Sequence, residues 1–358
     1  GVPASWADKT RMQRSALSAL RRGAGLFVRP SEVSPMAIRV ATFPSRGLCA
    51  PVQITAAMVK ELREKTGSPM MDCKKALQEG GGDHDKALEW LRKKGMATAA
   101  KKESRRSADG LICAMVDASG KRGSVVEVNA ETDFVARNPI FQDFVKNVCG
   151  LHLKAGPSVG LDAFKALMLP NGPQSKGEIS VEAAVKEMVA TVGENCQMRS
   201  CEGVEVSGEG AVFRYIHTPM GDDIGKVGVL VALESATTNK EAFNKLGVAL
   251  AMHVAAGKPL YNVVADIPAA HVEKEKEIFM AQAQESGKPA DIAEKMTVGR
   301  IKKWHDEVVL HEQEYLLGGE EKKTKVSKVL ANAEKELGAP VKLTGFVRIK
   351  CGEKTGEA

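Results

Sequence analysis

A pattern of two β-type runs followed by an amphipathic helix occurs twice in this chain and constrains its fold more than any other feature. The runs span residues 111–116 and 124–128 in the first copy and 211–216 and 227–233 in the second. The helices begin at Asn138-Pro139 and at Asn239, where asparagine can cap the first turn. The first pair is joined by the turn Gly120-Lys121-Arg122-Gly123, which predicts an antiparallel hairpin, and the second pair repeats this order. We therefore predict an α+β fold whose core consists of two related α+β subdomains, each with a small antiparallel sheet covered by helices.

Three short helical patterns precede this core, in residues 54–95. Thr55 can cap the first helix, Ser68-Pro69 can begin the second, and the third begins near Asp83 and is expected to end at Gly95. Three helices in so short a segment predict a small bundle, close to the lower size limit for independent folding. We predict a three-helix module of the ubiquitin-associated type.

The other segments complete the predicted domain organisation. Residues 96–109 are charged and lack an apolar stripe, which predicts a solvated linker or a frayed helix. Within the second half of the core, a highly charged helical pattern with a Ser-Gly-Lys-Pro break predicts a protruding helical hairpin. The predicted boundaries are 110–195 for the first core subdomain, 196–350 for the second, 269–317 for the hairpin and 351–358 for a tail.

The positive net charge of the chain is concentrated at its beginning. Residues 1–50 hold eight Lys and Arg side chains against two acidic ones, which accounts for the whole net charge of +6. This Arg-, Ser- and Ala-rich, acid-poor composition predicts a transit peptide without fixed structure, for the mitochondrion or alternatively the plastid. A disordered tail without a targeting role is the other interpretation. Because the rest of the chain has no net charge, we expect no direct binding to nucleic acid.

The remaining composition argues against an enzyme, a metalloprotein or a membrane protein. No apolar run approaches the roughly 20 residues that a spanning helix needs. The seven cysteines are scattered, with no C-x-x-C pair and no histidine at metal-binding spacing, so we expect reduced thiols and no metal. Phosphate-binding loops, dinucleotide fingerprints and H-E-x-x-H motifs are absent from the sequence. We expect no cofactor and no small-molecule substrate.

Two segments resemble the signatures of the translation elongation factor Ts family. They are I-T-A-A-M-V-K-E-L-R-E-K-T-G-S-P-M-M-D-C-K-K-A-L at 54–77 and E-V-N-A-E-T-D-F-V-A-R-N at 127–138. Further segments fit the family in the same order, at 224–232, 251–259 and 344–348. The resemblance covers most of the chain after residue 53.

This resemblance implies a guanine nucleotide exchange factor that acts without covalent chemistry on elongation factor Tu, here that of an organelle. It implies that the N-terminal module and the first core half contact the nucleotide domain of the GTPase, and that the second core half contacts another domain. The implied magnesium-dislodging element is Thr132, Asp133, Phe134 and Val135. The implied contacts of the small module are Arg63, Met70 and Met71.

Two of these residues have alternative interpretations. Phe134 follows a β-type run and precedes a helix cap, so it can either present its ring to a partner or pack in the core of its own subdomain. Asp133 can act electrostatically or simply cap a helix. On the 251–259 helix, His253 is expected to be packed or to contact the partner in the second core half, rather than to act as a general base.

Two other functions compete with nucleotide exchange. The three-helix module alone would also suit a ubiquitin-binding scaffold, but that function leaves the T-D-F-V segment and the duplicated core unexplained. A ribosome-associated RNA-binding protein would need stacking aromatics or a basic surface, whereas aromatic residues make up only 4% of the chain. Both alternatives lack exchange activity, so a measurement of nucleotide release distinguishes them from an exchange factor.

Overall fold

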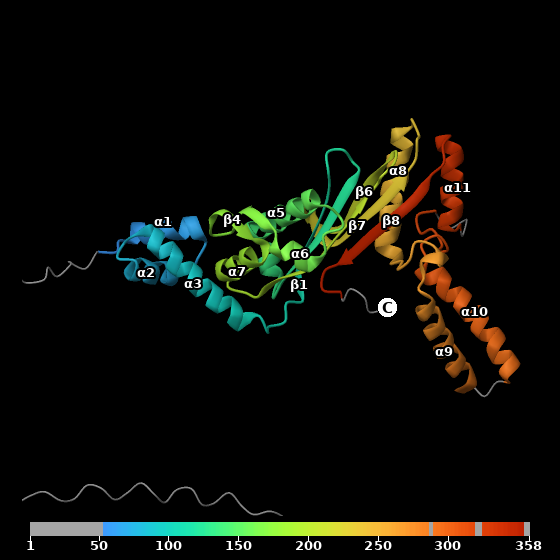
Figure 1. Cartoon of the computed structure of the whole chain (residues 1–358), viewed down its shortest axis with the longest axis horizontal. Coiled ribbons are helices and arrows are strands. Elements are labelled where there is room, and N and C mark those ends of the chain that lie inside the picture. Colours follow the sequence, from blue (N-terminus) through green and yellow to red (C-terminus); the bar gives the residue numbers. More distant parts are fainter. Residues whose placement is uncertain (1–52, 286–288, 319–323, 354–358) are drawn as a thin grey trace, which may run out of the picture. The chain divides into compact units, whose positions relative to one another are not determined.

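The computed structural model describes residues 53–285, 289–318 and 324–353 (Figure 1). The predicted leader and most of the predicted tail lie outside these ranges. Within them the chain is of the α+β class, as predicted, with antiparallel strands and covering helices. No helix in the described ranges is long and apolar enough to cross a membrane.

Three helices form the first part, α1 (Ala56–Thr66), α2 (Met70–Glu79) and α3 (His84–Lys102). Thr55 caps α1 by accepting a hydrogen bond from the amide of Met58, and Asp83 caps α3. The turn after α1 needs the positive φ of Gly67, +67°. The small core between the helices consists of buried apolar side chains: Val59, Leu62, Cys73, Ala76, Leu77, Ala87 and Leu91.

The third helix does not end at Gly95, as the sequence pattern predicted, but continues for two more turns. The reason is a close contact with α7 (Val181–Val192), which is an accessory helix of the core. A Cβ atom at Gly95 would lie 2.7 Å from the Cβ of Ala190, so glycine here permits two helices to approach rather than ending one. Ala99, one turn further, is buried in the main core.

The segment after α3 is held against the core and is not a free linker. Side-chain amides donate hydrogen bonds to its backbone carbonyls: Asn195 to Glu103 and Arg105, Gln197 to Glu103, and Asn129 to Ser107. These amides satisfy backbone acceptors that an irregular segment cannot pair by itself. Part of the predicted linker 96–109 is therefore helix, and part of the rest is fixed in place.

The first half of the core is a three-stranded group with helices on one face. β2 (Arg122–Ala130) pairs antiparallel with β1 (Asp109–Val116) and with β5 (Cys196–Glu205). The helices α5 (Pro139–Ala155) and α7 pack on it around buried residues such as Val126, Val128 and Phe141. β5 lies beyond residue 195, where the first subdomain was predicted to end, yet it pairs within this half.

The second half repeats this arrangement with different strands. β7 (Ile224–Glu234) lies between β6 (Gly210–Gly221) and β8 (Lys342–Lys350), both antiparallel to it. The helices α8 (Lys240–Gly257) and α11 (Val326–Leu337) enclose a second core with β7 and its neighbours, around Phe213, Val231 and Leu250. The two predicted strand-strand-helix units are thus both present.

The two halves share one six-stranded sheet. β1 pairs with the start of β7 through Ile112 with Gly225 and Cys113 with Ile224, next to the stretch of β7 that pairs with β8. The faces opposite the helices pack together in a third cluster of buried residues: Ile112, Ala114, Val125, Val206, Val212, Leu230, Ala232, Val347 and Ile349. A Cβ at Gly123 would meet Leu230, and one at Gly228 would meet Ile112, so the absence of side chains at both glycines allows this close approach.

The predicted hairpin consists of α9 (Ala269–Glu285) and α10 (Ala290–Val308), which lie side by side in Figure 1. Residues 309–317 form turns and isolated bridges rather than the predicted helix. The shorter elements are α4 (Asp133–Ala136), α6 (Leu161–Ala166), β3 (Met168–Asn171), β4 (Lys176–Ser180) and the 3-10 helix η1 (Val264–Asp266).

Candidate functional site

The T-D-F-V segment forms the junction between β2 and α5. β2 ends at Ala130, and the single-turn helix α4 follows before Asn138 caps α5 by accepting a hydrogen bond from the amide of Ile140. In α4 the side chain of Phe134 is 79% exposed, whereas that of Val135 is 6% exposed and packs in the first core. Phe134 is therefore not a core residue. Val135 faces inward, so it supports the segment and has no free surface to offer a partner.

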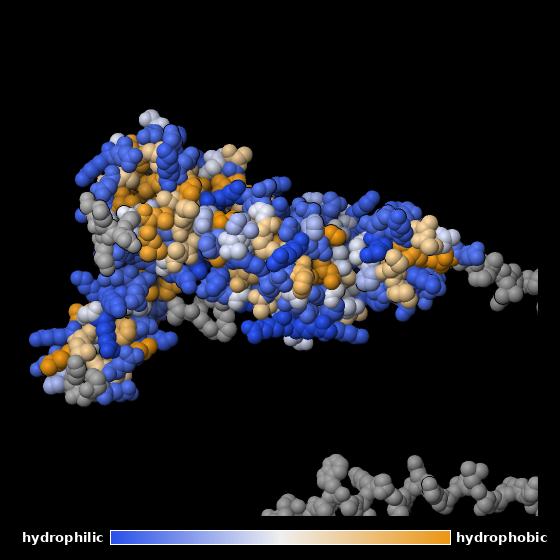
Figure 2. Space-filling model, turned by 180° about the vertical axis from the view of Figure 1, so that it is seen from behind, coloured by the Kyte–Doolittle hydropathy of each residue, from blue (hydrophilic) through white to orange (hydrophobic). Residues whose placement is uncertain are grey.

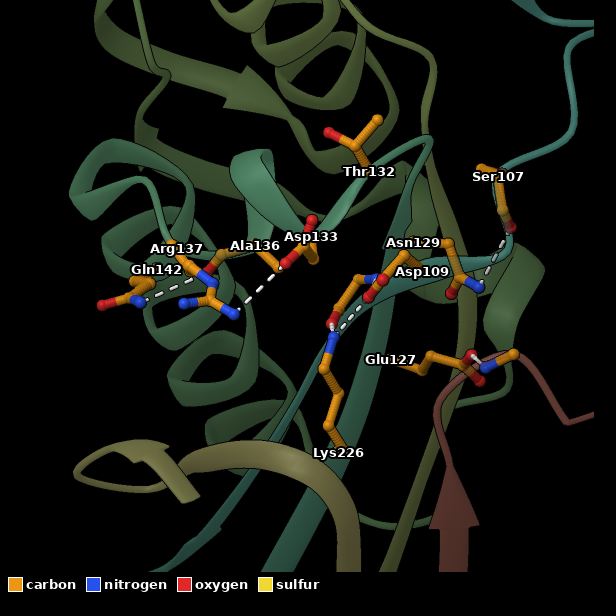
Figure 3. A network of polar contacts seen from close by, with 12 residues as sticks. Ser107, Asp109, Glu127, Asn129, Thr132, Asp133, Ala136, Arg137, Gln142 and Lys226 are labelled. Carbon is orange, nitrogen blue, oxygen red and sulfur yellow. Dashed lines mark hydrogen bonds and ion pairs between the residues drawn. The ribbon is translucent and has the colours of Figure 1, made fainter. Parts of the chain in front are cut away.

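Polar contacts hold the backbone of this junction (Figure 3). The side-chain amide of Gln142 donates to the carbonyl of Ala136 at 3.2 Å, which ties α4 to the first turn of α5. Asp133 forms an ion pair with Arg137 at 3.2 Å, one helical turn away. Both side chains of this pair are largely exposed, so its contribution to stability is small. Asp133 begins α4 and leaves a carboxylate at the surface beside Phe134.

Thr132 lies just before α4 and is fixed by a residue from the end of α7. Its backbone amide donates to Oε2 of Glu194 at 3.0 Å, and its hydroxyl donates to Oε1 of the same carboxylate at 2.8 Å. The hydroxyl therefore does not cap α4 itself. Glu194 stands 62 residues away in sequence, and no local pattern could have selected it.

The predicted residues of the small module are exposed at its surface. Met70 and Met71 are 52% and 64% exposed in the first turn of α2, and Arg63 is exposed on α1. The Thr-Gly-Ser-Pro turn between these helices is positioned by Gln174, whose side-chain amide donates to Ser68 at 3.1 Å and to Thr191 at 3.0 Å.

This turn also lies near the first turn of α5. A Cβ atom at Gly67 would lie 3.7 Å from Cδ1 of Ile140, which is a partly exposed residue in the first turn of α5. Ile140 was not among the predicted site residues, although its position two residues after a helix cap could have suggested exposure. The structure thus brings the turn at 66–69 and the adjoining Met70 and Met71, together called the methionine turn below, close to the start of α5. Phe134 lies in α4, the short helix before α5.

Exposed apolar side chains also occur elsewhere in the described part of the chain. On the face shown in Figure 2, apolar residues form separate patches within a mostly hydrophilic surface. Large exposed side chains outside the junction and the methionine turn include Val248, Met252, Leu260, Ile278, Ile292, Val298, Leu316 and Leu317. An exposed aromatic ring next to fixed backbone distinguishes the junction from these positions.

His253 lies on α8 and is buried, which favours packing, the first of its two expected roles, over contact with a partner. Its Nε2 is 3.0 Å from Oε1 of Gln313, and its Nδ1 accepts a hydrogen bond from the amide of Leu316. Burial lowers the pKa of His253, which favours the neutral ring. The histidine joins α8 to the segment after the hairpin, and its ring has no free surface for a partner.

Glu127, the first residue of the second signature, is also fully buried. Its carboxylate accepts hydrogen bonds from the amide of Gly352 at 2.8 Å and from the hydroxyl of Ser200 at 3.2 Å. Burial raises the pKa of Glu127, against the lowering effect of these donors and of Arg199. This part of the signature is structural, since it fixes the end of β8 onto β2.

The described residues contain no cluster of three or more His, Cys, Asp or Glu side chains that could hold a metal ion. The cysteines among them are free and mostly buried: Cys73, Cys113, Cys149, Cys196, Cys201 and Cys351.

Comparisons with known proteins place the chain among relatives of one family. A family model described as Elongation factor TS matches residues 131–353. Elongation factor Ts of Rhodospirillum rubrum is 48% identical over 301 residues, which cover 84% of this chain and 93% of the relative. Those of Paramagnetospirillum magneticum and Rickettsia felis are 48% and 45% identical, with 92% and 93% of their lengths covered.

Proposed function

This chain belongs to the elongation factor Ts family, and from that premise we propose that it is a guanine nucleotide exchange factor for elongation factor Tu. In this proposal the chain accelerates GDP release by disturbing the magnesium and phosphate site of the GTPase. The observation that carries it is the ring of Phe134, which is 79% exposed at a sheet-to-helix junction. No covalent step is required, so the chain changes a rate without consuming a substrate.

The mechanism follows from how a GTPase holds GDP. A magnesium ion and a phosphate-binding loop both bind the diphosphate of GDP. Magnesium demands near-ideal octahedral geometry. A rigid ring inserted beside that site can displace one ligand of the ion and thereby cost much of the affinity for GDP. Aromatic side chains contribute strongly at interfaces because they bury a large area with few rotatable bonds.

The affinities of the two ligands are linked. If the chain weakens GDP binding by some factor, bound GDP must weaken the binding of the chain by the same factor. Release of GDP and tight association therefore favour each other, and rebinding of a nucleotide releases the chain. This reciprocity is what allows one molecule to act many times.

Arg63, Met70 and Met71 supply a second contact in this proposal. The methionines are exposed, unbranched and adaptable, which suits a surface that must fit a partner. Their turn lies near the start of α5, since a Cβ at Gly67 would be 3.7 Å from Cδ1 of Ile140. We propose that the methionine turn and Phe134 both contact the nucleotide domain of elongation factor Tu.

We further propose that the partner is the elongation factor Tu of an organelle, in the first place the mitochondrion. The support is compositional, since residues 1–50 are rich in Arg, Ser and Ala and poor in acid. Imaging a fluorescent protein fused behind residues 1–60 tests this. Accumulation in plastids would favour the alternative compartment, and a diffuse signal would remove the targeting role.

The exchange function is tested by stopped-flow fluorescence on elongation factor Tu loaded with a fluorescent GDP. We expect the chain to accelerate GDP release, and Phe134→Ala to lower the maximal rate at least tenfold while the melting temperature stays unchanged, because the ring is outside the core. Val298→Ala is the matched control, since it also truncates an exposed apolar side chain, on the hairpin. No acceleration by the unmodified chain would refute the proposal. Equal losses in both variants would remove the special role of Phe134.

A further inference from the structure

The helix that presents Phe134 is too short to hold its own conformation. α4 comprises only residues 133–136, and a single turn is unstable in isolation because nucleation costs more than one hydrogen bond returns. The first amides of a helix have no partner within it, and the residue before α4, Thr132, makes no side-chain cap. Groups outside the helix must therefore fix its position.

Glu194 provides such a group. Its carboxylate accepts both the amide and the hydroxyl of Thr132, at 3.0 and 2.8 Å, in a two-point contact that fixes orientation as well as distance. Hydrogen bonds to an ionised carboxylate are about twice as strong as neutral ones. Glu194 is half-buried, so water screens this contact less than it would at the surface.

Glu131, which precedes Thr132, and Asn195, which follows Glu194, form a second connection. The amide of Asn195 donates to Oε1 of Glu131 at 2.6 Å, and Arg105 lies 3.5 Å from the same carboxylate oxygen. Two successive residues before α4 are thus bound by two successive residues after α7. The contact defines the direction in which the chain leaves β2.

The same turn is connected to the N-terminal module. Lys102, at the end of α3, donates to the carbonyl of Gly193, and Gly95 packs against Ala190 of α7. The side chain of Asn195 also donates to the carbonyl of Arg105 at 2.8 Å. The turn at 193–195 therefore touches both the module that carries the methionines and the segment that carries Phe134.

We propose that Glu194 is a positioning residue for nucleotide exchange, which holds Thr132 so that Phe134 is presented in a fixed direction relative to the methionine turn. This inference rests on the proposed exchange function and deepens it. Glu194 then acts through Thr132, and the role of Thr132 lies within the chain rather than in contact with the partner. Fixing the ring before association lowers the entropy that must be lost when it inserts.

The test compares variants of Glu194 and Thr132 in the full chain by stopped-flow GDP release. We expect Glu194→Gln and Thr132→Val to lower the maximal rate roughly tenfold, with little change in the factor concentration that gives half of that rate. Thr132→Ser should restore most of the rate because it keeps the hydroxyl. Glu182→Gln is the matched control at the other end of α7, where Glu182 pairs with exposed Lys186.

Two further measurements separate positioning from mere stabilisation. In a Phe134→Ala background, Glu194→Gln should cause no further loss of rate, since the residue it positions is gone. Fluorine NMR of the chain with a fluorinated phenylalanine at position 134 should show a more mobile ring in Glu194→Gln, at an unchanged melting temperature. This readout needs no partner and remains available if a variant loses activity.

The outcomes discriminate between the inference and the function on which it rests. If Phe134→Ala lowers the rate and Glu194→Gln does not, exchange stands and the positioning role is wrong. An equal effect of Glu194→Gln with and without Phe134 would also overturn it. If the unmodified chain does not accelerate release, the proposed function fails, and an unchanged ring mobility in Glu194→Gln would then refute the positioning role on its own.

Discussion

Neighbouring side chains in the single turn of α4 have opposite surroundings. Phe134 is exposed, while Val135 is enclosed by the core that α5 and α7 build on β1 and β2. Burial of Val135 attaches this turn to the core, whereas Glu194 and Gln142 hold its two ends through Thr132 and Ala136. We therefore expect these polar contacts to set the direction of the exposed ring.

Val135→Ala is expected to act on stability rather than on exchange. Removing two buried methyl groups should lower the free energy of unfolding by about 2 kcal/mol, from lost burial and the cavity left behind. The maximal rate of GDP release per folded molecule should remain close to that of the unmodified chain. Urea unfolding and stopped-flow release measure the two effects. If release is lost at unchanged stability, Val135 contacts the partner directly.

Glu127 gives the stability of the protein a specific dependence on pH. Burial raises the pKa of this carboxyl above its usual 4.5. Between that value and the higher folded value, the folded state keeps a proton that the unfolded state has lost, so stability falls as pH rises through this window. Glu127→Gln removes the titration but keeps a side chain of the same shape.

The free energy of unfolding of Glu127→Gln, relative to the unmodified chain, should therefore increase with pH above 4.5 and then level off. Urea unfolding at a series of pH values measures this difference. Other acids titrate in both proteins and cancel in the comparison. A difference that decreases with pH would show that Arg199 and the hydrogen-bond donors outweigh burial.

At the residue scale, sequence reasoning located the junction but could not determine which side chains face outward. Periodicity is uninformative in a segment of four residues, so Phe134 could equally have been core. His253 was expected either to pack or to contact the partner, and its burial against Gln313, 60 residues later, favours packing. Contacts of this kind form only when distant segments meet.

A glycine after an amphipathic stretch can either end a helix or lie inside it, as α1 and α3 show. Gly67 ends α1 with a positive φ, whereas Gly95 lies inside α3 and permits contact with Ala190. Both positions look alike in the sequence, as a glycine after an amphipathic stretch. The close approach of α3 to α7 is what joins the N-terminal module to the core.

Gly95→Ala is expected to destabilise the protein although alanine favours helices. Alanine in a helix interior gains about 1 kcal/mol over glycine. Its Cβ would, however, lie 2.7 Å from the Cβ of Ala190, and such overpacking typically costs 1–3 kcal/mol. We expect a net loss of about 1 kcal/mol in the free energy of unfolding.

Gly150→Ala is the matched control for this substitution. Gly150 lies within α5, and a Cβ there would meet nothing within 4 Å. This variant should gain about 0.5–1 kcal/mol, from helix propensity alone. Urea unfolding of both variants makes the comparison. Stabilisation by Gly95→Ala of the same size would show that α3 can move away from α7 at no cost.

At the element scale, the segments with local caps were predicted well. α1, α5 and α8 begin after the cap residues Thr55, Asn138 and Asn239, each of which accepts a hydrogen bond from the first turn. β5 was not predicted, because an irregularity in its pairing with β2 breaks the alternation of buried residues. α11 was also not predicted, although its buried residues recur at helical spacing: Val326, Leu330, Ala333 and Leu337.

For the whole molecule, duplication was visible in the sequence but the packing of its copies was not. Each strand-strand-helix unit can be derived from local patterns, whereas the shared sheet depends on a two-residue contact between β1 and β7. The third cluster of buried residues, where the two halves meet, also needs the glycines at positions 123 and 228, which leave room for side chains of the other half. Such long-range pairing leaves no periodic signal in the sequence.

The hairpin α9–α10 differs from the rest of the molecule because it packs mainly on itself. In the described part of the chain, four buried residues lie on these two helices: Ala283, Ala293, Thr297 and Ile301. At its base the hairpin is fixed by the carbonyl of Val308, which accepts from the amides of Leu260 and Tyr261. The outer part therefore contributes little to the core.

Replacing residues 275–300 by a short Gly-Ser linker should leave the core folded and the exchange reaction intact. The base contacts remain, and Phe134 and the methionine turn lie on other elements, so the maximal rate of GDP release should stay within about threefold, a change of less than 1 kcal/mol in the barrier. Thermal unfolding and stopped-flow release test both expectations. As a control, the same linker in place of the loop 118–121 between β1 and β2 reports on tolerance of a surface replacement. A loss of rate of tenfold or more in the hairpin variant alone, with an unchanged melting temperature, would show that the hairpin contacts the GTPase and that the exchange surface extends beyond the junction and the module.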